Sequence, residues 1–262
     1  MPKKGFSMID YAVITGGSSG IGQAAAIRLA AIGVPVLLVG RRSTTQKTLD
    51  AIANQGGSAE FFECDLSHYD SLQPALGNLI ATRSPNRIGL VLAASVLGAP
   101  AETSTAADYE KVFRVNVAGN TAVFEACLPW MRRRGFGRAV FFAGGGAAYG
   151  YPAFPAYALS KVSTVRLVEN LAARHPAAAG FSFVCLAPGA VETPMLAKVR
   201  AAGGEVKTKT DIGEPVRFIE NYFDSLSAVL HGRYLHVRDE WPAYLAGTKT
   251  LSEKQFFLRR IE

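Results

Sequence analysis

The feature that most constrains the fold is a regular alternation of short apolar runs with longer stretches of helical character. Runs typical of buried strands fall at Met8–Thr15, Val34–Val39, Glu60–Cys64, Ile88–Ala94, Ala139–Ala143 and Phe181–Ala187. Helical stretches lie between them at Gly20–Ala31, around Leu49–Ala53, and at Tyr69–Thr82, Tyr109–Arg133 and Ala156–Arg174. Strands that are apolar throughout and separated by helices indicate a parallel sheet covered on both faces. The expected fold class is therefore α/β, with a doubly wound parallel sheet flanked by helices.

The size of the chain fits one domain of this class. Doubly wound folds often reach ~250 residues as one unit, and the chain has 262 residues, of which 49% are hydrophobic. No linker-like stretch divides it, so we expect a single Rossmann-type domain over residues 1–262, with 239–262 as a C-terminal extension. The aromatic residues of that extension, Trp241, Tyr244, Phe256 and Phe257, should pack on their own subunit or on a neighbour.

Charge, cysteine content and apolar run length exclude several functional classes. The net charge of +7 is spread over small clusters, whereas a nucleic-acid binder concentrates its basic residues. No apolar run approaches the ~20 residues that span a bilayer, and no signal peptide is recognisable. The three cysteines, Cys64, Cys127 and Cys185, are too few for a disulfide framework and are expected to be buried thiols. We expect a cytoplasmic protein without nucleic-acid or membrane partners.

A glycine-rich turn follows the first expected strand and reads Thr15-Gly16-Gly17-Ser18-Ser19-Gly20-Ile21-Gly22. Glycine permits a tight turn and lets a ligand approach the backbone. The N-terminus of the next helix offers N–H groups and a positive dipole end to a pyrophosphate, and Ser18 and Ser19 add hydroxyl donors. The turn predicts a dinucleotide site, although by itself it is also compatible with an ordinary strand-to-helix connection.

The end of the second strand bears on which nicotinamide cofactor binds. An acidic residue there holds the ribose 2′-hydroxyl of NAD, whereas arginine suits the 2′-phosphate of NADP. This strand ends in Gly40-Arg41-Arg42 without an acid, and both arginines carry permanently charged, planar donor groups. The sequence predicts that NADP(H) is favoured over NAD(H); the alternative is a solvated basic turn.

Tyr157 and Lys161 lie four residues apart in an expected helix, so they share one face of it. A nearby cation lowers the pKa of a phenol from its ordinary value of about 10. Tyr157 is then suited to exchange a proton with a carbonyl or alcohol oxygen as a hydride moves. The alternative is an exposed helix face with no chemical role.

Together these motifs resemble the short-chain dehydrogenase/reductase family from Met8 to about Val237. Thr15, Gly16, Gly20, Ile21 and Gly22 match its T-G-x-x-x-G-I-G motif, and Tyr157–Lys161 matches its Y-x-A-S-K motif, with Leu159 where alanine is usual. The resemblance implies an oxidoreductase that interconverts a carbonyl and an alcohol of a small molecule by hydride transfer. It also implies a homodimer or homotetramer, assembled through the helices at Tyr109–Arg133 and Ala156–Arg174.

The resemblance assigns roles to residues at other strand ends. Asp65, followed by Leu66, matches an aspartate that contacts adenine, and Ala93 can offer its carbonyl to a ribose. Asn116 matches an asparagine that helps hold a proton-relaying water next to the lysine, and the Pro188–Thr193 loop matches one that contacts the nicotinamide and phosphates. The implied catalytic residues are Asn116, Tyr157 and Lys161, with no metal. The implied cofactor-binding residues are Gly16, Ser18, Ser19, Gly20, Ile21, Gly22, Arg41, Arg42, Asp65, Leu66, Ala93, Tyr157, Lys161, Pro188, Gly189, Val191 and Thr193.

Two departures from the family pattern bear on activity. The usual N-N-A-G after the fourth strand is replaced by Leu92-Ala93-Ala94-Ser95, and the position of the catalytic serine falls on Gly144. Losing one such donor can cost ~10²–10³ in rate. Three interpretations stay open: backbone N–H groups of the glycine run replace the hydroxyl, Tyr149 or Tyr151 does so, or the protein binds cofactor with little or no dehydrogenase activity, as a sensor or scaffold. We name Gly144, Gly145 and Tyr151 as substrate-binding candidates.

The stretch from Pro194 to Gly213 has the character of a loop and suits a mobile lid over the substrate. Its Lys207 and Lys209 would attract an anionic substrate, or they are simply solvated.

Overall fold

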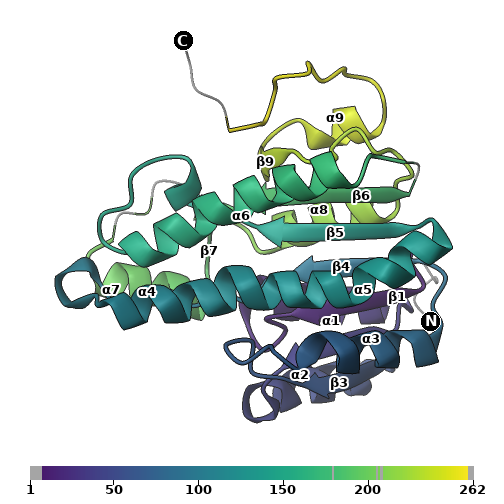
Figure 1. The fold of residues 1–262 in the computed structure, drawn as a ribbon, viewed down its shortest axis with the longest axis horizontal. Helices are drawn as coiled ribbons and strands as arrows, with labels where there is room; N and C mark the ends of the chain where they lie inside the picture. The colour runs from purple at the N-terminus through teal and green to yellow at the C-terminus, as the bar shows by residue number, and fades with distance from the viewer. Residues whose placement is uncertain (1–7, 179, 205, 207–208, 259–262) are drawn as a thin grey trace.

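Seven parallel strands form the central sheet in a computed structural model that describes residues 8–178, 180–204, 206 and 209–258. Their order across the sheet is β3-β2-β1-β4-β5-β6-β9 (Figure 1). The strands are β1 (Tyr11–Thr15), β2 (Val36–Gly40), β3 (Ala59–Glu63), β4 (Ile88–Leu92), β5 (Gly137–Phe142), β6 (Phe181–Ala187) and β9 (Tyr234–His236). The short strands β7 (Ala190–Val191) and β8 (Lys209–Thr210) pair separately. The expected doubly wound α/β fold of the Rossmann type is confirmed.

Helices cover both faces of the sheet. They are α1 (Gly20–Ala31), α2 (Arg42–Asn54), α3 (Leu72–Arg83), α4 (Ala106–Phe113), α5 (Asn120–Arg134), α6 (Pro155–Arg174), α7 (Pro194–Ala201), α8 (Gly213–Phe223) and α9 (Trp241–Leu245), with 3₁₀ turns at Ala101–Thr103 and Gly145–Ala147. Helices α3, α5 and α6 pack their apolar side chains on one face, and α1, α8 and α9 on the other. Figure 1 shows α5 and α6 in front of the sheet and α1 and α8 behind it. None of the described helices is long and apolar enough to cross a membrane.

The order of the strands reverses between β1 and β4. The chain runs from β1 outward to β2 and β3, then returns to place β4 on the other side of β1, where Thr15 pairs with Leu92. In open parallel sheets, ligands bind outside the carboxyl ends of the strands at such a reversal. The fold therefore places a binding crevice over the turns that follow Thr15 and Leu92.

The long helix expected at Tyr109–Arg133 is interrupted. Between α4 and α5, residues Arg114–Gly119 form a π-helical segment, a rare geometry that is frequent at functional sites. Just after it, Asn120 accepts a hydrogen bond from the Thr15 hydroxyl at 2.6 Å and donates one to the Ala94 carbonyl at 2.9 Å. The interruption thus ties the helix to the ends of both strands at the reversal.

The expectation of a loop throughout Pro194–Gly213 is wrong for its first part. Residues Pro194–Ala201 form α7, because Thr193 caps the helix by accepting a hydrogen bond from the Leu196 N–H, and proline is preorganised for the first helical position. Of the two lysines expected on the lid, Lys209 lies in β8, and Lys207 falls outside the described residues.

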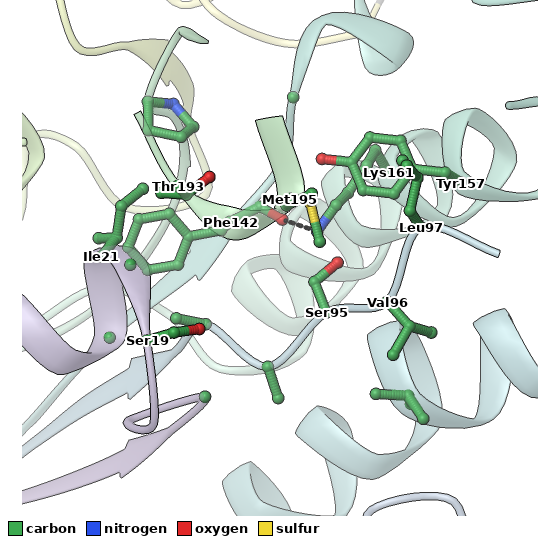
Figure 2. A pocket seen from close by; sticks show the side chains of 18 of the residues that line it. Ser19, Ile21, Ser95, Val96, Leu97, Phe142, Tyr157, Lys161, Thr193 and Met195 are labelled. Carbon is green, nitrogen blue, oxygen red and sulfur yellow. Dashed lines mark hydrogen bonds between the residues drawn. The ribbon is translucent and has the colours of Figure 1, made fainter. Parts of the chain in front are cut away.

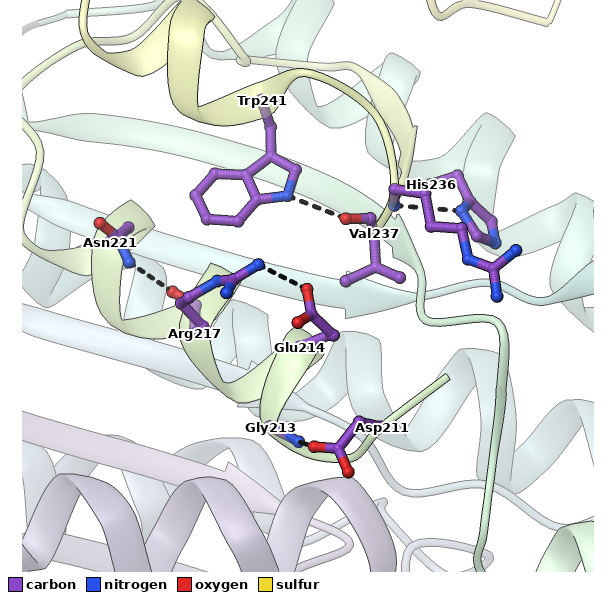
Figure 3. Close-up of polar contacts among 9 residues, drawn as sticks. Asp211, Gly213, Glu214, Arg217, Asn221, His236, Val237 and Trp241 are labelled. Atoms are coloured by element: carbon purple, nitrogen blue, oxygen red, sulfur yellow. Dashed lines mark hydrogen bonds and ion pairs between the residues drawn. The ribbon is translucent and has the colours of Figure 1, made fainter. Parts of the chain in front are cut away.

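The C-terminal aromatic residues pack onto this same chain. Trp241 of α9 is buried against Phe218 of α8, and its indole N–H donates to the Val237 carbonyl at 3.0 Å (Figure 3). Beyond α9 the chain returns to the edge of the sheet, where the Tyr234 N–H donates to the Phe256 carbonyl. The Leu258 N–H donates to the Glu169 carboxylate of α6 at 2.7 Å. The tail therefore covers strand β9 and contacts α6.

Candidate active site

A cleft of about 1220 Å³ opens at the carboxyl ends of the strands. It is larger than the ~300–1,000 Å³ of typical small-ligand sites, which leaves room for a dinucleotide and a substrate together. Of the residues named above as catalytic, cofactor-binding or substrate-binding, all but two line it: Gly16, Ser18, Ser19, Gly20, Ile21, Gly22, Arg41, Asp65, Leu66, Ala93, Gly144, Gly145, Tyr151, Tyr157, Lys161, Pro188, Gly189, Val191 and Thr193. The two that do not line it are Arg42 and Asn116.

The turn between β1 and α1 needs its glycines for close packing. Gly16 has a positive φ of 68°, and a Cβ on it would lie 2.7 Å from the Ala93 carbonyl carbon. A Cβ on Gly22 would overlap the Gly16 backbone. The Ser19 side chain makes no cap hydrogen bond to α1, and Figure 2 shows Ser19 and Ile21 beside the cleft. Because the first N–H groups of a helix lack intrahelical partners, this cradle fits the pyrophosphate of a dinucleotide.

The two arginines after β2 have different surroundings. Arg41 lines the cleft as the residue that precedes α2. Arg42 lies over the Phe61 ring, 4.9 Å from its centroid, and its Nε is 3.6 Å from the Glu63 carboxylate. The sequence placed both arginines at the cofactor, but the structure brings only Arg41 to the cleft, because the side chain of Arg42 contacts β3.

Asp65 lies at the cleft with its carboxylate already oriented. Its Oδ1 accepts hydrogen bonds from the N–H and the hydroxyl of Ser67, at 2.9 and 2.7 Å. These bonds hold the pKa of Asp65 below its ordinary value, so the carboxylate is charged at neutral pH. Both bonds engage Oδ1, so Oδ2 is the oxygen placed to accept a hydrogen bond from a ligand amino group.

The Asn116 side chain is buried and lies outside the cleft lining. Its side-chain oxygen accepts from the Val96 N–H at 2.7 Å, and its amide nitrogen donates to the Val96 carbonyl and to the Ser160 hydroxyl, both at 3.0 Å. The side chain therefore joins the loop after β4 to the helix that carries Tyr157 and Lys161. The implied catalytic role of Asn116 therefore stays a prediction, since its side chain bonds to Val96 and Ser160 and lies outside the cleft lining.

Tyr157 and Lys161 of α6 both line the cleft, as their spacing predicts (Figure 2). The Lys161 ammonium donates to the Phe142 carbonyl at 3.0 Å and lies 5.2 Å from the centre of the Tyr157 ring. Burial lowers the pKa of Lys161 to about 8. Burial, and then the neighbouring phenols of Tyr151 and Tyr234, raise the pKa of Tyr157. The direction for Tyr157 is opposite to the one expected from the sequence, because the phenol is buried and desolvation is the largest influence on its pKa.

The glycine run after β5 is a packed turn. A Cβ on Gly144 would lie 3.0 Å from the Tyr157 hydroxyl, and a Cβ on Gly146 would lie 2.7 Å from Cα of Ala158 in α6. At Gly145 the corresponding space is filled by the Tyr149 hydroxyl. The run thus lets α6 and two phenols approach the end of β5. This close packing explains why small residues stand here.

Two residues of β9 also face the cleft and were not expected from the sequence. The Tyr234 hydroxyl donates to the Gly144 carbonyl at 3.4 Å. His236 accepts at Nδ1 from the Arg238 N–H at 3.2 Å (Figure 3), and burial lowers its pKa. A neutral His236 therefore carries its proton on Nε2. Recognising β9 as a seventh strand would have pointed to both residues, because alternate residues of a strand share one face.

Comparison with known proteins identifies relatives. Residues 10–203 match the family described as short chain dehydrogenase. A short chain dehydrogenase of Pseudocercospora fijiensis is 32% identical over 190 residues, which cover 70% of this chain and 60% of the relative. Levodione reductase of Leifsonia aquatica is 33% identical over 188 residues, 70% of either protein. A Beutenbergia cavernae structure with bound NADP, assigned as an NAD(P) dependent gluconate 5-dehydrogenase, is 31% identical with a TM-score of 0.77, covering 89% of this chain and 96% of that one.

The chain thus spans less than two thirds of the length of the fungal relative. Within the described part of the chain, no group of three or more His, Cys, Asp or Glu side chains is placed to hold a metal ion.

Proposed function

Because the chain belongs to the short chain dehydrogenase family, we propose that it is an NADP(H)-dependent oxidoreductase that interconverts a carbonyl and an alcohol of a small molecule. The observation that carries the proposal is the convergence of three features on one cleft. The glycine turn at Gly16–Gly22, the phenol of Tyr157 and the ammonium of Lys161 all line it. A nicotinamide bound there supplies or accepts the hydride.

The remaining chemistry is a proton exchange at the reacting oxygen. The raised pKa of Tyr157 keeps its hydroxyl protonated at neutral pH, so Tyr157 donates its proton to a carbonyl oxygen as negative charge develops there. The Lys161 ammonium, held by the Phe142 carbonyl, stabilises the phenolate that forms, because opposite charges attract strongly in a dry site. In the reverse direction the phenolate accepts the proton of the alcohol.

A backbone donor replaces the missing serine hydroxyl in this proposal. Gly145 begins a 3₁₀ turn, and the first N–H groups of such a turn have no partner inside it, because each bond runs back three residues. Gly144 and Gly145 both line the cleft, and Gly144 lies next to the Tyr157 hydroxyl. Their N–H groups are therefore suited to donate to the substrate oxygen, and Tyr151 forms part of the adjoining wall.

The proposed preference for NADP(H) depends on Arg41. The experiment is to titrate NADPH and NADH into Arg41→Ala and, as a matched control, Arg42→Ala. A hydrogen bond to a charged group contributes ~1.5–3 kcal/mol, so Arg41→Ala should raise the Kd for NADPH at least about tenfold and leave that for NADH nearly unchanged. Arg42→Ala should change little, since Arg42 contacts Phe61 and Glu63. A lower wild-type Kd for NADH than for NADPH contradicts the preference.

The proposed reaction is tested by single-turnover oxidation of bound NADPH against a panel of carbonyl compounds. We expect at least one carbonyl to be reduced, and Tyr157→Phe to abolish the reduction while NADPH still binds. The second candidate function, a cofactor-binding sensor or scaffold with little activity, is favoured by the glycine at position 144. NADPH binding without oxidation by any member of the panel would support that candidate.

We further propose a single-domain subunit that assembles with itself and works in the cytoplasm. Helix α6 exposes Leu159 and Val162, with 51% and 37% of their surface accessible, and exposed apolar side chains on one helix support a symmetric contact. The buried free thiols of Cys127 and Cys185 support a reducing compartment. Light scattering of the wild type and of Leu159→Glu tests the assembly, since a charge in the contact should shift it toward monomer.

A further inference from the structure

Ser95 is a cleft residue to which neither the motif pattern nor the proposed mechanism gives a role. It follows β4, and both neighbours in sequence are held by buried side chains. The Ala94 N–H donates to the Thr15 hydroxyl at 3.1 Å, and the Val96 N–H donates to the Asn116 side-chain oxygen at 2.7 Å. The backbone of Ser95 is therefore fixed between the end of β1 and the π-helical segment.

The Ser95 hydroxyl is buried and makes no hydrogen bond among the described residues. Burying a hydroxyl without a partner costs free energy, so most buried hydroxyls have one. Of the described side-chain atoms in this condition, the Ser95 Oγ is the one that belongs to the cleft lining. Figure 2 shows this hydroxyl turned toward the part of the cleft where Lys161 and Met195 lie. An oxygen or nitrogen atom of a ligand bound in the cleft would supply the hydrogen-bond partner that this hydroxyl lacks.

The sequence around Ser95 supports the same reading. Ser95 stands where the family pattern N-N-A-G ends in glycine, whereas Gly144 stands where the family carries its serine. Compared with the family pattern, the hydroxyl expected after β5 is absent and one is present after β4. Both positions line the same cleft.

We propose that Ser95 is a ligand-binding residue whose hydroxyl hydrogen-bonds an oxygen atom of the molecule seated beside Lys161. This inference rests on the proposed function. That oxygen belongs either to a sugar hydroxyl of the nicotinamide nucleotide or to the reacting group of the substrate. The two sources share one chemistry, an oxygen that can pair with the hydroxyl of a serine.

The test compares Ser95→Ala with Ser104→Ala. Ser104 has a hydroxyl that is equally buried and unpartnered but lies outside the cleft lining, so it controls for the loss of such a group. NADPH affinity is measured by fluorescence titration, and KM and kcat are measured with a carbonyl that the wild type reduces. A neutral hydrogen bond corresponds to about a 2- to 12-fold change in binding, which we expect for Ser95→Ala and not for Ser104→Ala.

The pattern of the change identifies the source of the oxygen. A higher Kd for NADPH with unchanged KM assigns the contact to the nucleotide sugar, whereas an unchanged Kd with a lower kcat/KM assigns it to the substrate. The Tm of nucleotide-free Ser95→Ala should equal or exceed that of the wild type, because an unpartnered buried hydroxyl is removed. Unchanged Kd and kcat/KM, or a fall in Tm of several degrees, would overturn the role of Ser95 alone. A wild type that does not bind NADPH would overturn the proposed function together with it.

Discussion

Replacing Lys161 by methionine should change how the stability of the protein depends on pH. Lys161 is 3% exposed, and burial lowers its pKa from 10.5 to about 8. The folded protein therefore holds this proton less tightly than the unfolded chain does. Between about pH 8 and pH 10.5 the unfolded chain binds more protons at this site, so the free energy of unfolding rises with pH.

The size of the effect follows from the shift. One pKa unit corresponds to about 1.4 kcal/mol, so a shift from 10.5 to about 8 corresponds to about 3 kcal/mol over the whole window. Below pH 8 both states are protonated and the full penalty of burying the ammonium is present. Most of that penalty is removed by pH 10.

The assay is urea unfolding of nucleotide-free wild type and Lys161→Met at pH 7, 8.5 and 10. The raised pKa of Tyr157 acts in the opposite direction, but the tyrosine is present in both proteins and largely cancels in the difference. We expect the wild type to gain about 2–3 kcal/mol relative to the variant between pH 7 and pH 10. The exposed Lys198, changed to methionine, controls for the loss of a surface lysine. A constant difference between wild type and Lys161→Met across the three pH values would refute the argument.

Two glycine substitutions test the packing of the site. Gly144→Ser should change kcat/KM by less than tenfold, because the proposed mechanism already assigns backbone N–H groups to the substrate oxygen and the new Cβ would lie 3.0 Å from the Tyr157 hydroxyl. A gain of a hundredfold or more in steady-state assays would show that the native site is impaired. Gly16→Ala should lower the free energy of unfolding by about 1–3 kcal/mol more than Gly135→Ala does, the usual cost of forcing atoms into a packed site, as measured by urea unfolding. Both glycines have a φ near 65°, with a strain of ~1–2 kcal/mol for alanine, but only at Gly16 does the Cβ meet backbone, that of Ala93. Equal losses would contradict the close-packing explanation.

The sequence was most informative where a strand is apolar along its whole length. Strands β1, β2 and β4 follow from such runs, because a strand buried on both faces offers few positions to polar side chains. Strand β3 contains Glu60 and Glu63 and is only partly buried, and β5 and β6 carry the buried polar side chains of Arg138 and Ser182, so these three were recognised from an apolar majority. Strand β9 was missed because its three residues include one buried apolar side chain, Leu235, between the polar side chains of Tyr234 and His236. Its place in the sheet is set by pairing with β6, a long-range contact that local patterns do not encode.

At the site, the spacing of residues predicted which side chains lie close together. It did not predict their protonation states or the directions in which they point. The separation of Tyr157 and Lys161 predicted a shared cleft, whereas the pKa of Tyr157 depends on how deeply α6 is buried, and that depends on the whole fold. The choice between Arg41 and Arg42 depended on side-chain direction at the start of α2. The buried hydroxyl of Ser95 became visible only when its lack of a partner could be checked in three dimensions.

The tail beyond α9 has a consequence for solubility as well as for shape. Strand β9 ends the sheet, and its outer side is occupied through the bond from the Tyr234 N–H to the Phe256 carbonyl. An uncovered strand edge offers its N–H and C=O groups to any other extended chain. A protein cut after α9 would lose the partner of the Tyr234 N–H at this edge, and we expect it to be more prone to join other copies edge to edge. The residues that follow α9 thus protect the outer edge of β9, the last strand of the seven-stranded sheet.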